Sequence, residues 1–340
     1  MVTGSTPSRR TVLKGLALAG VAAAAGACTS RAAAQGDFTY RLGTNQPIGS
    51  PAHVRMAEMA AAIAADSNGA LRIEVHPNSA LGSDNDMLAA VRAGELDFYL
   101  AGNNLGPVAQ VSELPTLPYI FHDNATVFRA LDGELGDYIR ARLADNGLHA
   151  FPYYMQNGFH QLTSNVKPIA SADDLRGLTL RTPIMKMPSE FFRLFGAEPV
   201  GITFNKMYDS LRDGVVQAQT DPMGIVVSLR LYEVQKYLSM TNHWWSGFLL
   251  VANPGSWNRL PADLRDVVNR NQQKYALLHR QDVDAVNDAG IGTLTGKGML
   301  VNDVDTASFT ARLGGFYDTW RGIYGQDVWN ILRRFTNAVT

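Results

Sequence analysis

Strand-like and helix-like patterns alternate through residues 38–100, and this alternation restricts the fold more than any other feature of the chain. Residues 38–42 alternate apolar and polar side chains, which predicts a strand. Ser50 and Pro51 then supply an N-cap and a first-turn proline for a helix to about residue 66. The same order repeats to residue 100. Strands that alternate with helices predict an α/β protein with a mixed, mostly parallel sheet.

The alternation continues beyond residue 100 with less regularity. Apolar spacing predicts one helix from Asn124 to about Leu143, ended by Gly147. Short strands are expected at Leu178–Arg181 and Val215–Gln219. No linker or tandem repeat separates these elements, so two lobes interleaved in sequence and joined by several crossing segments are expected.

The segment from residue 261 to 289 predicts an unusually long helix, because it contains no internal glycine or proline. Its apolar residues lie close to one stripe. At 1.5 Å per residue the helix would be about 44 Å long, against roughly 30 Å for a small domain. A helix longer than one lobe is expected to lie across two. Two helices broken near Arg280 are the alternative that the pattern leaves open.

The N-terminal segment has the pattern of an export signal. Residues 8–14 read SRRTVLK, a twin-arginine motif, and an apolar run from Leu16 to Ala27 follows. That run is too short to span a bilayer, which needs about 20 apolar residues. Residues 1–34 are therefore predicted to be a twin-arginine-type signal segment, and the protein is predicted to be periplasmic.

Two cleavage positions fit this segment. Residues 25–27 precede Cys28 as in a lipoprotein box, which makes Cys28 a candidate lipid anchor that would tether the chain to the membrane. Residues 32–34 are three alanines before Gln35, as at an ordinary signal-peptidase site. Both positions stay open. Cys28 is the only cysteine, so the body of the protein contains no disulfide.

Charge and length limit the classes of partner. The chain carries 30 Lys and Arg against 31 Asp and Glu, which gives no sign of a nucleic-acid partner. About 300 residues remain after the signal segment, enough for two lobes with separate cores. No later segment is apolar enough to span a membrane.

The sequence contains none of the common short catalytic motifs. It has no Gly-x-Ser-x-Gly, no His-Glu-x-x-His, no phosphate-binding loop and no cysteine cluster. His160 and Asp221 could form a catalytic pair, but two polar residues do not make an activated nucleophile. We therefore expect no enzyme activity, no metal and no cofactor.

Several stretches, taken in order, resemble the TRAP-type solute-binding proteins of the DctP-like family (tripartite ATP-independent periplasmic transporters). Together they cover most of residues 38–275. They read HPNSALG from His76, AGELD from Ala93, LPYIF from Leu117, DLRGLTLR from Asp174, FGAEPV from Phe195, YDSLRDGVV from Tyr208 and YEVQKY from Tyr232.

The resemblance implies two α/β lobes that close by a hinge motion onto a small organic acid, with a long helix bridging both lobes. Lobe I is expected to contain residues 36–157 and 247–286, and lobe II residues 158–246 and 287–340. The expected function is that of the extracytoplasmic subunit that captures an organic carboxylate and delivers it to TRAP membrane permease subunits. A sensory protein that presents an organic acid to a receptor kinase is the alternative.

Arg181 is the residue that the resemblance implies to bind the ligand carboxylate. A guanidinium matches a carboxylate through two parallel hydrogen bonds and stays charged when dehydrated. The alternative is a structural arginine paired with an acid of the same lobe.

The resemblance implies three further cleft residues, and position at the end of a predicted strand indicates two more. Asn45 would hydrogen-bond the ligand, unless it serves only as a turn residue. Asp84 would face the cleft, unless it is only a helix N-cap. Phe204 would pack on the ligand, although a core phenylalanine gives the same sequence pattern. Ala101 and Gly102 follow the third predicted strand, at the carboxyl end where α/β clefts bind ligands.

Four departures from the family pattern concern the ligand. His160 stands where many relatives carry a second arginine, and Asp221 where asparagine is usual; Gly102 and Leu105 replace charges of sialic-acid-binding relatives. This pattern argues against sialic acid. Asp221 near Arg181 would repel a second ligand carboxylate and can accept a hydrogen bond from a hydroxyl or ammonium group. We therefore expect a monocarboxylate with a donor group rather than a dicarboxylate.

Overall fold

The computed structural model describes residues 38–339. The predicted export signal, its two cleavage positions and the candidate lipid anchor Cys28 lie outside this range. Within it, none of the helices combines the length and the apolar character needed to cross a bilayer.

The described strands form one mixed sheet of eleven strands, and β2-β1-β3-β10-β5-β8-β6-β7 is the order along its main path. Strands β1, β2 and β3 run parallel to one another, as do β6, β7 and β8, whereas β5 and β10 run antiparallel to their neighbours. The strands are β1 (Phe38–Gly43), β2 (Leu71–His76), β3 (Phe98–Ala101), β4 (His149–Ala150), β5 (Met155–Ser164), β6 (Thr179–Thr182), β7 (Glu198–Gly201), β8 (Ala218–Pro222), β9 (Tyr237–Met240), β10 (Trp245–Ala252) and β11 (Leu300–Asp303).

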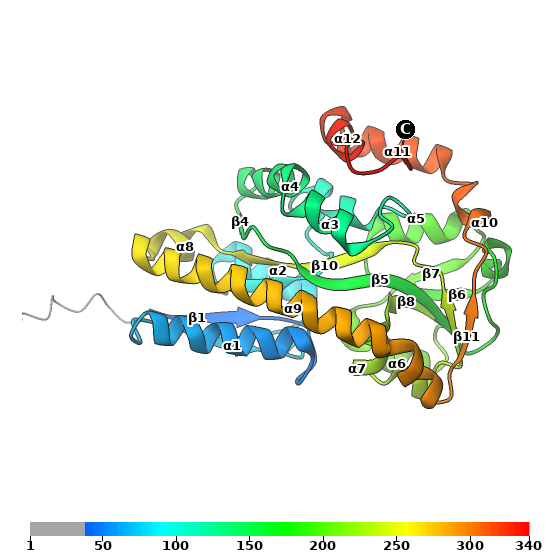
Figure 1. Cartoon of the computed structure of the whole chain (residues 1–340), viewed down its shortest axis with the longest axis horizontal. Coiled ribbons are helices and arrows are strands. Elements are labelled where there is room, and N and C mark those ends of the chain that lie inside the picture. The colour runs from blue at the N-terminus through cyan, green and yellow to red at the C-terminus, as the bar shows by residue number, and fades with distance from the viewer. Residues whose placement is uncertain (1–37, 340) are drawn as a thin grey trace, which may run out of the picture. The chain divides into compact units, whose positions relative to one another are not determined.

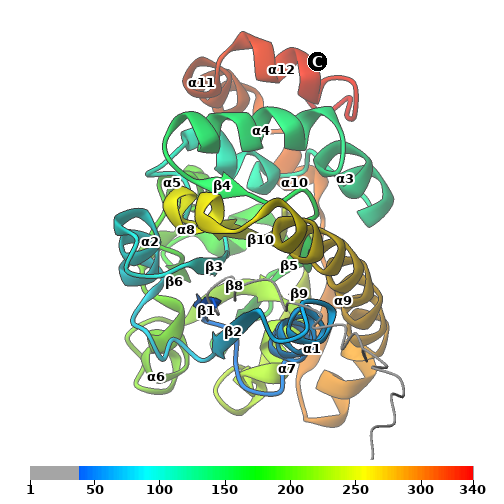
Figure 2. The ribbon, with the colours of Figure 1, turned by 90° about the vertical axis from the view of Figure 1, so that its left-hand side faces the viewer.

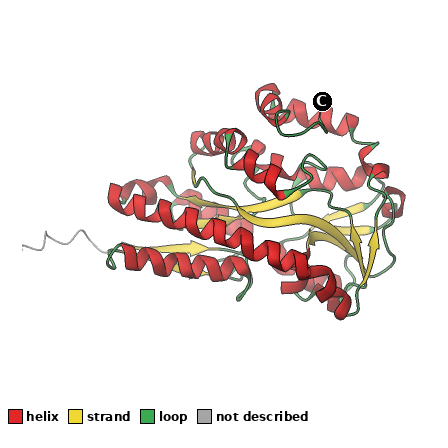
Figure 3. Ribbon diagram, viewed as in Figure 1, coloured by secondary structure: helices red, strands yellow, loops and turns green. Residues whose placement is uncertain are grey.

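Helices lie on both sides of the strands (Figures 1 and 3). The α-helices are α1 (Pro51–Asp66), α2 (Asp84–Ala93), α3 (Asn124–Leu131), α4 (Glu134–Asp145), α5 (Lys186–Leu194), α6 (Met207–Arg212), α7 (Met223–Ser228), α8 (Pro254–Arg259), α9 (Ala262–Gly296), α10 (Ala307–Thr310), α11 (Gly314–Tyr324) and α12 (Gln326–Leu332). Short 3₁₀ helices are η1 (Gln110–Thr116), η2 (Ala172–Leu175), η3 (Phe204–Lys206) and η4 (Leu231–Glu233). The predicted start of α1 is confirmed, because the Ser50 hydroxyl accepts a hydrogen bond from the backbone N–H of His53.

Strands β5 and β10 cross the middle of the sheet side by side and connect its two halves. Their register shifts between Ser246 and Gly247. A Cβ at Gly247 would lie 2.2 Å from the Trp245 ring and 2.7 Å from the Met155 carbonyl oxygen, so only glycine fits there. Gly158 has a φ of 117°, which other residues rarely adopt. Two of the three lobe boundaries expected from the sequence fall within these two strands and the third falls within the helix of residues 262–296; all three stay a prediction.

Helix α9 joins the two lobes, as expected. It runs unbroken for 35 residues, or about 52 Å at 1.5 Å per residue, so the alternative break near Arg280 is wrong. Val268 and Tyr275 pack in the core around β1 and α1, and Leu294 packs in a separate core with Met207 of α6. Figure 1 shows α9 passing α1 at one end and α7 at the other.

The single helix predicted for residues 124–143 is two helices, α3 and α4, and the N-cap is Asp123 rather than Asn124. The chain turns at Asp132 and Gly133, two residues with low helix propensity. Both carboxylate oxygens of Asp132 accept hydrogen bonds from Arg280 of α9, each at 2.7 Å. This contact holds the turn against the long helix.

The C-terminal helices α11 and α12 pack on η1 and α4, at the top of Figure 2. Trp320 and Trp329 are buried there in one core cluster with Leu114 and Leu135. The sequence analysis assigned these C-terminal residues to lobe II, and that assignment stays a prediction.

Candidate ligand-binding site

A pocket opens where the parallel strands of both halves of the sheet end, the usual place for a ligand in an α/β protein. Its empty space is about 670 Å³, with the open solvent at its mouth included. It is lined by Asn45, Gln46, Asp84, Asn85, Gly102, Asn103, Asn104, Asn157, His160, Arg181, Pro183, Ile184, Met185, Ile202, Thr203, Phe204, Asp221 and Phe248.

The structure brings together seven of the eight residues predicted as ligand contacts, and their role in binding stays a prediction. The seven in the lining are Asn45, Asp84, Gly102, His160, Arg181, Phe204 and Asp221. The eighth, Ala101, is the last residue of β3 and is fully buried in the core.

Arg181 extends from the third position of β6 and is 2% exposed. Its Nε donates to the carbonyl oxygen of Ile202 at 3.0 Å, and its Nη1 donates to Oδ2 of Asp221 at 3.1 Å. Nη2 donates to no residue of the described chain. Burial lowers the pKa of Arg181, and the charges of Asp221 and Asp84 oppose that shift. An arginine side chain remains charged under these conditions, so the pocket holds a partly unpaired cation.

A strand was predicted at residues 215–219, whereas the observed β8 runs from Ala218 to Pro222. Asp221 therefore lies within the sheet. Asp221 pairs with Gln161 of β5, and its neighbour Gln219 pairs with Arg181 of β6. Burial raises the pKa of Asp221 to about 7, although the positive charge of Arg181 opposes the rise.

Both ring nitrogens of His160 are already bonded to protein groups. Nδ1 lies 3.0 Å from the Thr220 hydroxyl, and Nε2 lies 2.8 Å from the Ser246 hydroxyl. The side chain of Asn157 donates to the same Ser246 oxygen at 3.0 Å. His160 therefore lines the pocket without offering a free ring nitrogen to a ligand.

A chain of hydrogen bonds continues from this histidine. The Thr220 hydroxyl lies 2.8 Å from Nε2 of His243, whose Nδ1 lies 2.7 Å from the Thr241 hydroxyl. Thr241 in turn donates to the carbonyl oxygen of His160 at 3.5 Å. Every hydroxyl and N–H finds an acceptor if Ser246 donates to Nε2 of His160 and each later bond runs in the same direction. This arrangement requires both imidazoles to be neutral.

The electrostatics agree with neutral histidines. Burial, followed by the positive charge of Arg181, lowers the pKa of His160 to about 3. Burial also lowers the pKa of His243 well below its usual value. Position 160, where the resemblance implied a departure from a second arginine, therefore supplies no positive charge in this pocket.

Asp84 is the central residue of the opposite wall. The structure makes Ser83 the N-cap of α2, so the simple N-cap interpretation of Asp84 is wrong. Oδ1 of Asp84 lies 2.8 Å from the donating Nδ2 of Asn45 and 3.0 Å from the Tyr99 hydroxyl. Asn104 donates to the backbone oxygen of Asp84 at 2.9 Å. Burial raises the pKa of Asp84, and the bonds from Asn45 and Tyr99 reduce that rise.

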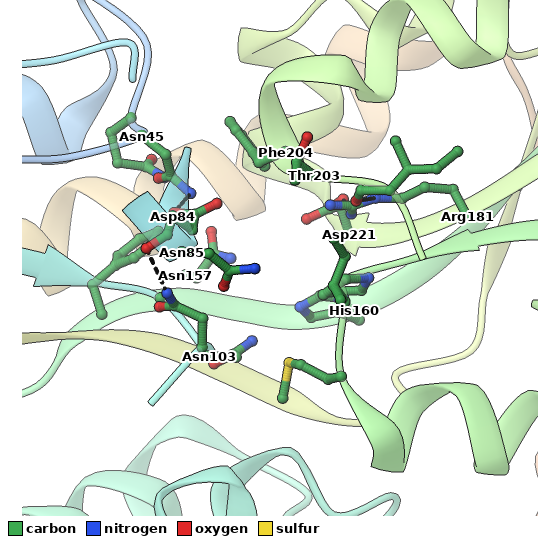
Figure 4. A pocket seen from close by; sticks show the side chains of 18 residues that line it. Asn45, Asp84, Asn85, Asn103, Asn157, His160, Arg181, Thr203, Phe204 and Asp221 are labelled. Atoms are coloured by element: carbon green, nitrogen blue, oxygen red, sulfur yellow. Dashed lines mark hydrogen bonds and ion pairs between the residues drawn. The ribbon is translucent and has the colours of Figure 1, made fainter. Parts of the chain in front are cut away.

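Figure 4 shows the two walls facing each other, with Asn45, Asp84 and neighbouring asparagines on one side and Arg181 and Asp221 on the other. Sequence reasoning missed most of the asparagines. Asn85 and Asn103 make no side-chain hydrogen bond to the described residues, so their amides are available to a ligand. Their positions in the sequence could have identified them, because Asn103 directly follows Gly102 at the end of β3 and Asn85 directly follows Asp84.

Residues 42–322 match the family of bacterial extracellular solute-binding proteins, family 7, known as DctP. The chain belongs to the DctP family. It is a TRAP-type solute-binding protein, a periplasmic component that works with a TRAP permease.

Relatives and solved structures agree with this assignment. The 2,3-diketo-L-gulonate-binding periplasmic protein YiaO of Escherichia coli is 30% identical over 90% of this chain and 92% of its own length. The C4-dicarboxylate-binding protein DctP of Rhodobacter capsulatus is 31% identical over 58% of this chain and 60% of its own. A TRAP solute-binding protein from Polaromonas sp. JS666, bound to D-erythronate, has a TM-score of 0.83 at 25% identity and covers 87% of this chain and 98% of its own. The DctP fold of two lobes is thus shared.

Proposed function

We propose that this DctP-family protein captures a monocarboxylate that carries several hydroxyl groups and delivers it unchanged to its permease. The observation that carries the proposal is the buried guanidinium of Arg181, whose Nη2 donates to no described residue although Arg181 lines the pocket. A ligand carboxylate would complete the hydrogen bonding of this cation.

The opposite wall supports a polar, uncharged remainder of the ligand. Six side-chain amides line the pocket, and those of Asn85 and Asn103, which make no side-chain hydrogen bond to the described residues, offer both a donor and an acceptor. The six amides belong to Asn45, Gln46, Asn85, Asn103, Asn104 and Asn157. Hydroxyl groups, which also donate and accept, are the natural partners of such a wall. The ligands of two relatives, diketogulonate for YiaO and D-erythronate for the Polaromonas protein, belong to this chemical class.

A second ligand carboxylate fits this pocket poorly. Arg181 is the only cation in the described lining, and Asp221 and Asp84 would repel a second negative charge. We therefore infer a different preference from that of the C4-dicarboxylate-binding relative of R. capsulatus.

The required affinity is within reach of these contacts. A micromolar dissociation constant corresponds to about −8.2 kcal/mol. A ligand of about ten non-hydrogen atoms would then contribute roughly 0.8 kcal/mol per atom, below the ceiling of about 1.5 for small ligands.

We also infer that the pocket performs no catalysis. A histidine that acts as a general base needs a free ring nitrogen, and both ring nitrogens of His160 are bonded to hydroxyls. Ligand recovered from the protein after prolonged incubation should be chemically unchanged, and conversion detected by mass spectrometry would contradict this inference.

Capture is proposed to close the pocket between lobe I (36–157 and 247–286) and lobe II (158–246 and 287–340). The register shift in β10 and the glycines of the crossing strands support a hinge at this place. The export signal and a lipid tether at Cys28 remain proposals, and the mass of the mature N-terminal peptide distinguishes cleavage before Cys28 from cleavage near residue 34.

A thermal-shift screen tests the proposed ligand class. Hydroxylated monocarboxylates such as D-erythronate, L-galactonate and D-glucuronate are compared with succinate and malate at pH 7.5. A ligand at a hundredfold excess over its dissociation constant adds about 2.7 kcal/mol to stability. We expect this shift from at least one sugar acid. Tight binding of succinate or malate, with none of the sugar acids binding, would contradict the proposal.

A further inference from the structure

The pocket has an unbalanced charge. Arg181 is the one cation of the described lining, whereas Asp84 and Asp221 are both acids. With both acids ionised, the lining carries one net negative charge, and an organic anion would add another. Charges interact strongly in a buried, weakly solvated pocket, so a bound anion needs a compensating change.

Asp221 is the acid that competes directly with a ligand carboxylate. Its Oδ2 lies 3.1 Å from Nη1 of Arg181, on the guanidinium that the ligand would use. Asp84 lies on the opposite wall, where Asn45 and Tyr99 donate hydrogen bonds to its Oδ1 (Figure 4). From the described residues, Asp221 receives a side-chain hydrogen bond from Arg181 alone. If a ligand carboxylate takes Arg181 as its partner, the negative charge of the buried Asp221 carboxylate is left uncompensated.

We propose that Asp221 determines which anions the pocket accepts by taking up one proton when the ligand binds. This inference rests on the proposed function, because it assumes that the ligand carboxylate pairs with Arg181. The proton comes from solvent and forms the O–H bond of a neutral carboxyl group, which then donates a hydrogen bond to a ligand oxygen. The incoming negative charge and the incoming proton cancel, so capture leaves the net charge of the pocket unchanged.

The other titratable groups near Asp221 do not provide this compensation. Burial lowers the pKa of His160 of β5 and of His243, so both stay neutral, and Arg181 of β6 is already charged. Across the pocket, Asp84 of α2 retains its two donors, one of which is Tyr99 of β3. Burial raises the pKa of Asp221 to about 7, so its protonation costs little near neutral pH, and the ligand charge raises that pKa further.

The test counts protons by isothermal titration calorimetry at pH 8. D-Erythronate, L-galactonate and D-glucuronate are titrated in phosphate and in Tris, whose ionisation enthalpies differ widely. An acid with a pKa near 7 is mostly ionised at pH 8, so wild type should take up about 0.9 proton per bound ligand. Its affinity should fall about tenfold between pH 8 and pH 9.

Two variants locate the proton. Asp221→Asn should abolish proton uptake and bind with the same affinity at pH 8 and pH 9. Glu113→Gln is the matched control, because burial also raises the pKa of Glu113 to about 7 although this acid lies outside the pocket lining. Proton uptake should remain complete in this control.

Wild-type uptake below about 0.2 proton would overturn the inference, and so would uptake that survives in Asp221→Asn, which would indicate Asp84 instead. Binding that requires sodium and takes up no proton would overturn it as well. If none of the three acids binds wild type, the proposed function fails, and the inference fails with it.

Discussion

Two buried arginines of this protein pair with aspartates in different ways. Arg280 of α9 donates two hydrogen bonds of 2.7 Å to the carboxylate of Asp132 and two more, at 2.9 and 2.7 Å, to the carbonyl oxygen of Tyr154. Its guanidinium also lies 3.7 Å from the centre of the Phe128 ring. Arg181 instead makes one bond of 3.1 Å to an aspartate and one of 3.0 Å to a carbonyl oxygen.

The difference separates a structural arginine from one that is available to a ligand. The contacts of Arg280 occupy all three of its nitrogen atoms, and it fixes α9 against the end of α3. Arg181 has a nitrogen that donates to no described residue, and it lines the pocket. The structural interpretation of Arg181 that the sequence left open accounts for only part of its hydrogen bonding.

Replacing Arg181 should have the largest effect. We expect Arg181→Ala to weaken binding of the preferred acid about a thousandfold, or about 4 kcal/mol, because truncating one partner of a buried charge pair costs 2–5 kcal/mol or more. Its melting temperature should change little, since Asp221 can take up a proton. Calorimetry and thermal unfolding of the same preparation measure both quantities. A loss of affinity below tenfold would remove Arg181 from the site.

Replacing Arg280 should give the opposite result. Arg280→Ala leaves Asp132 without its partner and should lower the free energy of unfolding by about 3 kcal/mol. Affinity should stay within a few-fold of wild type, because Arg280 does not line the pocket. Denaturant unfolding and calorimetry test this expectation. Unchanged stability, or a loss of affinity as large as that of Arg181→Ala, would break the comparison.

Replacing the two aspartates should change the free energy of unfolding in opposite directions. The folded pKa of Asp221, about 7, lies above its usual value of 3.8. The folded state therefore holds the proton more tightly, and the contribution of Asp221 to stability is complete below pH 4 and is lost as pH rises through 7. Asp221→Asn avoids that loss and should stabilise the ligand-free protein by about 2 kcal/mol at pH 8, but not at pH 4.

Asp132→Asn is the matched variant and should destabilise the protein by about 3 kcal/mol, because it leaves Arg280 buried without a counter-charge. Urea unfolding at several pH values measures both variants. Destabilisation by Asp221→Asn at pH 8 would mean that the Arg181–Asp221 pair is structural.

The smallest effect concerns the amide wall. Asn103→Ala should weaken binding of a hydroxylated acid by about 1 kcal/mol, the net value of one hydrogen bond, or about fivefold. Asn269→Ala, at an exposed position of α9, is the control and should leave affinity unchanged. Equal affinities of the two variants would remove Asn103 from the ligand contacts.

Local signals predicted much of the fold. Ser50 and Pro51 gave the start of α1, and the uninterrupted segment after Pro261 gave α9. Long-range contacts decided the failures. The turn at Asp132 depends on an arginine 148 residues away in sequence, which no local pattern contains. Strand β5, MQNGFHQLTS, lacks clear alternation because neighbours bury both of its faces.

For the site, the family resemblance identified the charged residues but not most of the amide side chains. Arg181 and Asp221 lie in stretches where family motifs or departures from them could be recognised. Asn85 and Asn103 are ordinary loop or helix-start residues in sequence, and only the meeting of two distant segments makes them a wall. The ring nitrogens of His160 are hydrogen-bonded to Thr220 of β8 and Ser246 of β10, two strands that are distant from His160 in sequence.

A crystal structure of the complex with the tightest-binding acid of the screen tests the central claim most directly. We predict that the ligand carboxylate lies on Arg181, with an oxygen about 2.7–2.9 Å from Nη2, and that the rest of the ligand points toward the amides. A ligand bound with its carboxylate against the amide wall, or outside the pocket with Arg181 still paired only to Asp221, would contradict the account.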